Sequence, residues 1–252
     1  MKTFIPPTWR INVRVFQRYL SDLSTGRSHQ LANCRAIDAD GKVELYPQIA
    51  LTQPLGSISA QYFDNKKHNL LLAIQKLQDV VIAPGQIFSF WHLVGNPNLK
   101  AGYVQGRTIM GEKLATTIGG GLCQISGLVY FLALKSGLTI IERHSHSKDI
   151  YTDATRFAPL GSDATVVYGY KDLRFQNNLS SPICFRFFIK DQDISTCICS
   201  DQPIAEARIE FCLQQLDSGT QVETIRYMPA IAKSELISSD FYPKMLAPSH
   251  LQ

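Results

Sequence analysis

The sequence predicts an α+β fold in which a glycine loop, a helix and a strand form a core that carries cysteine and histidine, packed on a mostly antiparallel sheet. Apolar residues recur at helical spacing in the first half of the chain, and short β-prone segments separated by polar turns fill most of the second half. Between them, Gly119-Gly120-Gly121 directly precedes an apolar helical segment. Helices early and strands late are typical of an α+β arrangement.

The first thirty residues are basic and partly amphipathic. Arg10, Arg14 and Arg18 lie four residues apart, so a helix would place them on one face. Two interpretations stay open. The helix rests on an anionic membrane surface, or it is a surface helix that docks by its apolar side.

The segment that follows predicts one helix and then strands. From Asn65 an apolar stripe has helical spacing, over Leu70, Ile74, Leu77 and Val81. Residues 83–86 predict a turn, residues 87–91 a strand, and residues 102–116 a β-hairpin around Gly111-Glu112.

After the glycine run we expect a helix over about 122–136, ended by Gly137, and then a strand over 138–143. Further strands are predicted over 165–170, 184–189, 194–199 and 207–213, and the last thirty residues are expected to be irregular. The domain organisation we predict is a basic N-terminal segment and leading strand (1–64), a central domain (65–215) and a C-terminal tail (216–252).

Length, composition and charge are those of an ordinary globular protein. The chain has 252 residues, of which 45% are hydrophobic and 18% charged, and a net charge of +4, which does not by itself indicate nucleic acid. We predict no membrane-spanning helix and no secretory signal, and hence a location in the cytoplasm. The six cysteines are expected to be reduced, and five of them to be buried.

Cys123 is the best candidate for a nucleophile. It follows the three glycines and begins a helix, where free backbone N–H groups stabilise a thiolate and lower the pKa of the thiol from ~8.5 to between ~3.5 and ~7.5. A helix of about fourteen residues spans ~21 Å, and six or seven strand residues return a comparable distance. The end of the strand, with His144 and His146, can therefore lie beside Cys123.

The other parts of a thiol-dependent site are available nearby. Either histidine is a candidate general base, and Asp163 could accept a hydrogen bond from its second ring nitrogen. The backbone N–H groups of Cys123 and its glycine neighbours are candidate oxyanion donors. Further polar groups that could line the site come from Gln124, Ser126 and Arg143.

Plainer interpretations compete with each assignment. Cys123 could be a small core residue, Asp163 could cap a turn, and Arg143 could form a structural ion pair with Glu142. The two histidines share one side of an extended segment and could bind a metal, but no third ligand has suitable spacing. We therefore predict neither a metal nor another cofactor.

Five ordered motifs in this sequence resemble the VanW-like family, whose similarity runs from about Asn65 to Cys199. They are Pro84–Phe90, Gly119–Ser126, Glu142–Ser147, Asp163–Val166 followed by Tyr168-Gly169, and Asp172–Asn178. The family takes its name from accessory proteins of bacterial glycopeptide-resistance clusters, and related domains in membrane-anchored cell-wall proteins are linked to a cysteine-dependent L,D-transpeptidase activity. The resemblance implies that Cys123 is the acylated nucleophile, and it favours His146 as the base because His146 begins the His-Ser pair of the motif.

Two functions are expected from these residues and this resemblance. The first is cysteine-dependent acyl transfer or amide cleavage on peptidoglycan-type stem peptides, in cell-wall metabolism or vancomycin resistance. The second is a non-catalytic accessory role, in which the protein binds cell-wall precursors or a partner. We expect a peptidoglycan-type peptide or precursor as partner, no nucleic acid, and peripheral contact with an anionic membrane at its inner face as an open alternative.

Overall fold

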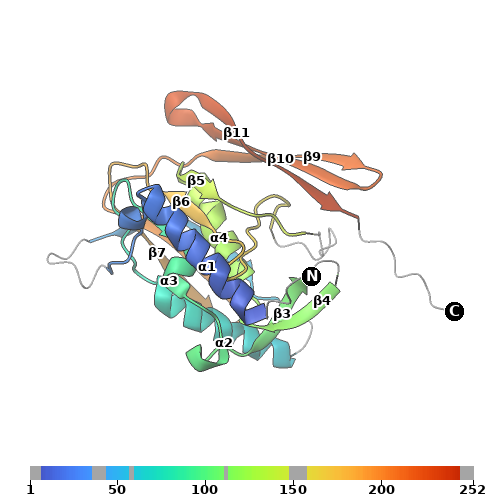
Figure 1. Ribbon diagram of the computed structural model, residues 1–252. Helices are drawn as coiled ribbons and strands as arrows, with labels where there is room; N and C mark the ends of the chain where they lie inside the picture. The colour runs from blue at the N-terminus through green and yellow to red at the C-terminus, as the bar shows by residue number, and fades with distance from the viewer. Residues whose placement is uncertain (1–6, 36–43, 57–59, 111–112, 148–157, 245–252) are drawn as a thin grey trace.

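The computed structural model describes residues 7–35, 44–56, 60–110, 113–147 and 158–244 (Figure 1). The first half contains four α-helices and five strands: α1 (Pro7–Ser24), β1 (Tyr46–Pro54), α2 (Ala60–Leu77), β2 (Ile87–Ser89), α3 (Phe90–Val94), β3 (Gln105–Met110), β4 (Lys113–Ile118), α4 (Cys123–Lys135) and β5 (Thr139–Glu142). The second half is built from strands: β6 (Arg174–Gln176), β7 (Ile183–Lys190), β8 (Asp193–Ser200), β9 (Arg208–Leu216), β10 (Gly219–Met228) and β11 (Lys233–Pro243). Three short 3-10 helices lie at Arg27–Gln30, Leu99–Ala101 and Pro229–Ile231.

The predicted α+β class is confirmed, but the strands form several small antiparallel sheets instead of one. Among the described residues the strand orders are β1-β8-β7, β11-β10-β9, β2-β6-β5 and the β3-β4 hairpin. The pairing between β5 and β6 is only a few residues long and shifts register between Ile140 and Glu142. Such short, irregular edges do not extend into one continuous sheet.

Helix α4 lies at the centre of the main core and positions the glycine loop. Apolar side chains on every side of it are buried, including Ile125, Leu128, Val129 and Leu132. A helix that is apolar all round is buried in the core. The prediction for this segment is confirmed, because the helix ends at Lys135 and Gly137 follows with φ +71°.

Helix α2 and the hairpin after it agree with the sequence in most respects. Leu70 and Leu77 are buried on one face of α2, but the helix begins at Ala60 and ends before Val81. The hairpin of β3 and β4 is present, although its expected turn at 111–112 lies outside the described residues. The predicted strand over 87–91 is limited to Ile87–Ser89, because the Ser89 side chain accepts a hydrogen bond from the His92 backbone N–H and so begins helix α3.

Two predicted elements are wrong. Residues 165–170 form no strand: Val167 and Lys171 pair across a tight turn that contains Gly169 at φ +80°. Within the last thirty residues, the described part up to Lys244 is not irregular, since β10 and β11 pair along almost their whole length; residues 245–252 lie outside the described residues. Their strand pattern is hidden because polar side chains such as Thr224 and Arg226 occupy buried positions.

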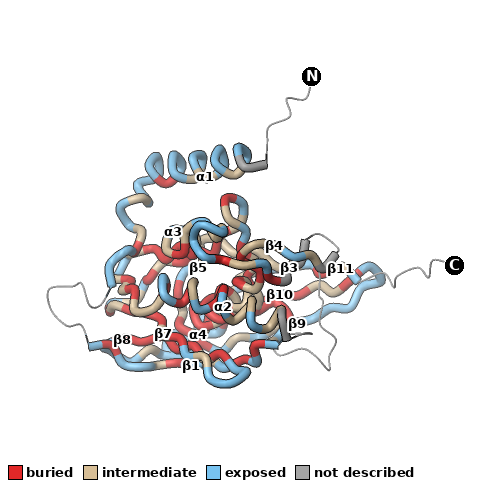
Figure 2. The backbone as a smooth tube through the Cα atoms, turned by 90° about the horizontal axis from the view of Figure 1, so that it is seen from below, coloured by how far each residue is buried: buried red, intermediate tan, exposed pale blue. Residues whose placement is uncertain are grey.

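Helix α1 is present and docks on the body, but unlike in the surface-helix interpretation most of its large apolar side chains face outward. Figure 2 shows it lying along one side of the body, with most of its length exposed. Its Asp22 is buried, whereas Trp9 and Phe16 are 67% and 58% exposed. The docked face therefore combines the apolar Ile11 and Val15 with Arg18 and Asp22, and the outer face is apolar.

All six cysteines are free thiols. Cys184, Cys197 and Cys199 are buried together, but Cys34 and Cys212 are exposed, so the expectation of five buried thiols is wrong. No helix within the described parts of the chain has the length and apolar character needed to cross a membrane.

Candidate functional site

Cys123 is the first residue of α4, directly after the glycine loop. Its side chain is partly buried, and its Sγ atom lies 3.9 Å from the carbonyl oxygen of Val166. Gly119 and Gly121 adopt φ angles of +76° and +101°, which only glycine adopts without strain. The loop therefore enters α4 with a backbone conformation that residues with a Cβ atom would adopt only with strain.

His146 lies between the thiol and a carboxylate. Its Nδ1 atom is 2.7 Å from Oδ2 of Asp163, and its backbone N–H donates to the same oxygen at 2.6 Å. The side chain of His146 is also hydrogen-bonded to the Cys123 thiol. Because Nδ1 faces Asp163, Nε2 is the ring nitrogen left to face sulfur. The three side chains form a Cys–His–Asp arrangement.

Asp163 is held in place by groups from distant parts of the chain. Its Oδ1 accepts a hydrogen bond from the Tyr242 hydroxyl at 2.5 Å and lies 3.2 Å from Nη2 of Arg143. Arg143 also donates to the backbone carbonyl of Asp163 at 2.7 Å and pairs with Asp240. The carboxylate that orients His146 is therefore held directly by Tyr242 of β11 and by Arg143, and Arg143 is in turn held by Asp240 of β11.

The electrostatics of this site favour an ion pair between thiolate and imidazolium. Burial by itself raises the pKa of the Cys123 thiol, but the hydrogen bond and positive charge of His146 outweigh it, and the net shift is downward. Burial likewise opposes the charged form of His146, yet its bonds to Asp163 and Cys123 raise its pKa to about 10. Although desolvation opposes ionisation of Asp163, His146 and Arg143 hold its pKa well below the usual range.

Lys66 of α2 adds a second positive charge near the thiol. Its Nζ donates to the backbone carbonyls of Leu55 and Gly56, and its side chain packs against Gly121. Burial lowers the pKa of Lys66 to about 8, an effect that the charge of Cys123 partly offsets. Among the described residues, no carboxylate pairs with this ammonium group, so it can act on the thiolate or on an anionic ligand.

The glycine loop is held by close backbone contacts. The Asn69 side chain donates to the carbonyls of Val104 and Gly120, both at 3.0 Å. A Cβ atom on Gly106 would lie only 2.4 Å from the Gly120 carbonyl oxygen, so only glycine fits there.

The same contacts reduce the number of candidate oxyanion donors. The N–H groups of Gly119 and Gly120 already donate to the carbonyls of Val104 and Thr117. Of the predicted oxyanion donors, the backbone N–H groups of Gly121 and Cys123 therefore remain as candidates.

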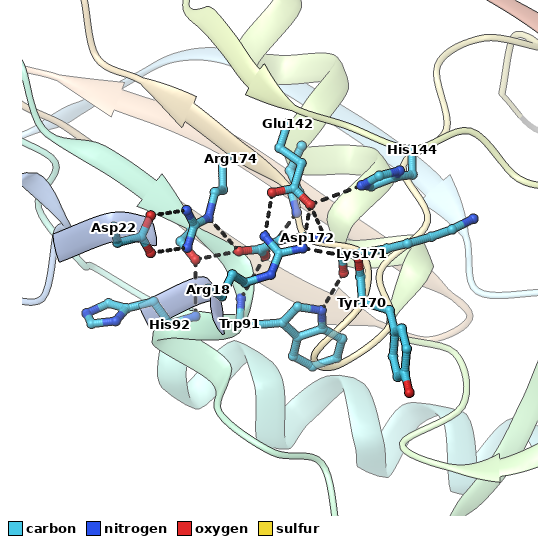
Figure 3. A network of polar contacts seen from close by, with 12 residues as sticks. Arg18, Asp22, Trp91, His92, Glu142, His144, Tyr170, Lys171, Asp172 and Arg174 are labelled. Atoms are coloured by element: carbon cyan, nitrogen blue, oxygen red, sulfur yellow. Dashed lines mark hydrogen bonds and ion pairs between the residues drawn. The ribbon is translucent and has the colours of Figure 1, made fainter. Parts of the chain in front are cut away.

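His144 takes part in a different network, shown in Figure 3. Its Nε2 lies 3.0 Å from Glu142, which also pairs with Arg18 at 2.5 Å and accepts from the backbone of Asp172 at 2.9 Å. Burial opposes the charge of Glu142, but Arg18 and these partners lower its pKa to about 2. Of the two histidines, only His146 is hydrogen-bonded to Cys123 in this arrangement.

The remaining predicted site residues have structural partners. Ser126 is fully buried and donates to the carbonyl of Ala164 at 2.6 Å, so it fixes the segment after Asp163 to α4. Arg143 is only 4% exposed at its side chain and supports Asp163, so it does not line an open surface. Gln124 donates to the carbonyl of Pro54 at 2.8 Å, and its buried Oε1 has no partner within the described residues.

Within the part of the chain that the structure describes, no group of three or more His, Cys, Asp or Glu side chains could hold a metal ion. The two histidines contact separate carboxylates: His144 contacts Glu142, and His146 contacts Asp163.

Three residues of the site were missed in the sequence: Lys66, Asp240 and Tyr242. Lys66 lies one helical turn before Leu70, on the buried stripe of α2, and a lysine in that register is a signal that could have been used. Asp240 and Tyr242 gave no such signal, because their place in the site depends on how β11 pairs with β10.

Comparisons with known proteins show which family this sequence is similar to. The VanW-like protein family profile matches residues 65–199. The chain is 31% identical over 182 residues to the vancomycin B-type resistance protein VanW of Enterococcus faecalis, which covers 70% of this chain and 66% of that protein. It is also 31% identical over 155 residues to the uncharacterized protein YoaR of Bacillus subtilis, covering 58% of this chain and 50% of YoaR.

The matched region is thus under two thirds of the length of each relative. No solved structure matches the chain significantly. Because the family profile covers more than half of the chain and includes the glycine loop, His146 and Asp163, this protein belongs to the VanW-like family.

Proposed function

We propose that this protein is a cysteine-dependent acyltransferase or amide hydrolase that acts on peptidoglycan-type stem peptides. The observation that carries the proposal is the Cys123–His146–Asp163 arrangement, in which the pKa of the thiol is lowered and that of the imidazole is raised to about 10. An ion pair of this kind supplies a nucleophile and a proton donor at neutral pH without further activation.

The first half of the reaction would form a thioester. The Cys123 thiolate attacks the carbonyl carbon of the donor amide, and the C–N bond then breaks. The leaving amine takes its proton from Nε2 of His146, whose Nδ1–H stays hydrogen-bonded to Asp163. Backbone N–H groups at the start of α4 are candidates to bind the oxyanion.

The second half returns the enzyme to its starting state. An acceptor amine, or water in the hydrolytic case, attacks the thioester carbonyl and gives its proton to His146. The C–S bond breaks, the thiolate leaves, and the acyl group ends on the acceptor as an amide or a free acid. Protons and electron pairs balance, so the cycle needs no cofactor.

The choice of substrate class is supported by family membership and by Lys66. A relative named as a vancomycin resistance protein connects the family to the bacterial cell wall. Stem peptides carry carboxylates, and the buried ammonium of Lys66 beside the thiol would attract one. The buried Oε1 of Gln124, next in sequence to Cys123, could accept a hydrogen bond from a peptide N–H.

The test is to trap the acyl-enzyme by intact-protein mass spectrometry. The full chain is incubated with synthetic stem peptides, with and without an amine acceptor. We expect an adduct on Cys123 that disappears when acceptor is added, no adduct with Cys123→Ala and a much weaker one with Cys123→Ser. Cys212→Ala is the matched control, because that thiol is exposed and contacts no histidine among the described residues. A folded protein that forms no adduct or product with any stem peptide would contradict the proposal.

The second candidate is a non-catalytic accessory protein that binds cell-wall precursors at a membrane surface. The outward apolar face of α1 favours the membrane part of this alternative. In a cell-wall phenotype assay, undiminished function of Cys123→Ala would select it over the enzyme.

A further inference from the structure

Helix α1 exposes a continuous row of apolar side chains. Trp9, Val13, Phe16, Leu20 and Leu23 follow one another at spacings of four and three residues, which places them in a single stripe along the helix. They are 67%, 42%, 58%, 46% and 43% exposed, respectively. Tyr19, which is 56% exposed, lies beside this stripe. We call these six residues the outer face of α1.

The opposite face of α1 is fixed to the body by ion pairs and close packing. Both carboxylate oxygens of Asp22 accept hydrogen bonds from Arg174, at 2.7 and 2.8 Å, and both side chains are buried. Arg18 makes a bidentate pair with Glu142, at 2.5 and 2.8 Å. Because these contacts hold the helix in one rotation about its axis, its outer face cannot turn inward without breaking two buried or half-buried ion pairs.

Within α1 itself, the exposed charges beside the outer face are positive. Arg10 and Arg14 lie along one flank and are exposed, and Asp22, which is buried and paired, is the single acidic residue of Pro7–Ser24. Arg14 also borders a shallow cavity of about 260 Å³ whose lining includes Gln17, Arg18 and Tyr170. Aromatic and aliphatic side chains flanked by arginines match the boundary between acyl chains and anionic headgroups.

We infer that the outer face of α1 binds the surface of an anionic lipid bilayer, with the helix lying in the plane of the interface. A second copy of this chain fits less well, because it would bring an identical row of arginines against the first. A bilayer with anionic lipids accepts the apolar stripe and attracts the positive charge of Arg10 and Arg14.

This binding would also orient the candidate site. The main chain of Gly169 packs against Ile11 and Val15, and Arg18 donates to the carbonyl of Tyr170 at 3.1 Å. The same loop begins a few residues earlier at Val166, whose carbonyl contacts Cys123. Helix α1 is therefore fixed directly to the segment that lines the thiol, so a bilayer bound at α1 would face the body from a defined side.

The test measures binding of the full chain to vesicles of phosphatidylcholine alone and of phosphatidylcholine with 30% phosphatidylglycerol, by co-sedimentation. We expect binding to the anionic vesicles that weakens on raising NaCl from 0.05 to 0.5 M, since the Debye length falls from over ~10 Å to a few ångströms. The triple variant Trp9→Ser, Phe16→Ser, Leu20→Ser and the double variant Arg10→Glu, Arg14→Glu should each lower the partition coefficient by about tenfold or more.

The matched control removes exposed apolar side chains from the C-terminal sheet, by Leu213→Ser, Ile231→Ser and Leu236→Ser, and should bind as the wild type does. In a Trp91→Phe background, Trp9 fluorescence should shift to the blue on binding, because Trp9 is then the single tryptophan. The inference is overturned if no vesicle binds, or if the triple variant binds as the wild type does. A concentration-dependent dimer that the triple variant abolishes would overturn it in favour of a second copy. Thioester formation at Cys123 is measured separately, so either proposal can fail alone.

Discussion

Asp163→Asn is the substitution that probes the site most sharply, because it keeps the size of the side chain and removes its charge. In the wild type the pKa of His146 is about 10, against about 6.5 for an ordinary histidine. That difference corresponds to about 5 kcal/mol of stabilisation of the imidazolium. The hydrogen bond to Asp163 is the largest contribution that raises this pKa. We therefore expect the substitution to lower the pKa of His146 by about 1.5 or more, which is about 2 kcal/mol.

The assay is an NMR titration of the His146 ring in protein labelled with ¹⁵N at histidine. Asp240→Asn is the matched control, because Asp240 also pairs with Arg143 but does not contact His146. The control should change the pKa of His146 by less than half as much. If both variants leave the pKa of His146 within about 0.3 of the wild-type value, Asp163 does not hold the imidazolium and the triad is wrong.

Three further predictions test other parts of the site. The rate of acyl transfer should rise with pH as the Cys123 thiol ionises below its ordinary pKa and fall as His146 loses its proton near pH 10; a pH–rate profile with a single limb near the ordinary pKa of cysteine would contradict the ion pair. Because the pKa of His146 is raised in the folded protein, its stabilisation of the fold should be complete below about pH 6.5 and be lost as the pH rises through 10. In chemical denaturation, Gly121→Ala should lower the free energy of unfolding by about 1–3 kcal/mol, because alanine is strained at a φ of +101° and its Cβ would lie 2.8 Å from Lys66. The Cβ of Gly85→Ala meets nothing within 4 Å, so this control should lower the free energy of unfolding by less; an equal loss would argue against the Gly121–Lys66 contact. Lys66→Met should slow alkylation of Cys123 at pH 6 about three- to tenfold by raising the pKa of the thiol, and an unchanged rate would show that the ammonium does not act on it.

Much of the candidate site could be predicted from sequence because its parts lie in short local motifs. Glycines before Cys123 and a histidine at the end of the next strand are brought together by one helix and its return strand. Local geometry was enough to place the two histidines near the thiol, whereas Asp163 was only a candidate partner that could equally have capped a turn. It could not separate the two histidines, because that choice depends on which carboxylate each one contacts: His144 contacts Glu142, and His146 contacts Asp163.

The parts that sequence reasoning missed depend on contacts between distant segments. Tyr242 and Asp240 reach Asp163 and Arg143 from about eighty to one hundred residues further along the chain. One of the two interpretations of α1 placed its apolar residues against the body, because burial of apolar area is the usual driving force. Instead the buried Asp22–Arg174 ion pair, together with Ile11 and Val15 packed against Gly169, fixes the opposite face inward. The spacing of residues within α1 does not show that Arg174 is the partner of Asp22.

The measurement that tests the central claim most directly is alkylation of each cysteine as a function of pH, resolved by site with mass spectrometry. Wild type is compared with His146→Ala, and His144→Ala serves as the matched control, because His144 faces Glu142 and not the thiol. The account predicts that Cys123 reacts well below pH 8, that His146→Ala abolishes this reactivity, and that His144→Ala retains it. Cys34 and Cys212 should react only as ordinary exposed thiols. If Cys123 in the folded wild type is as unreactive as buried Cys184, the activated thiol does not exist and the proposed enzyme is wrong.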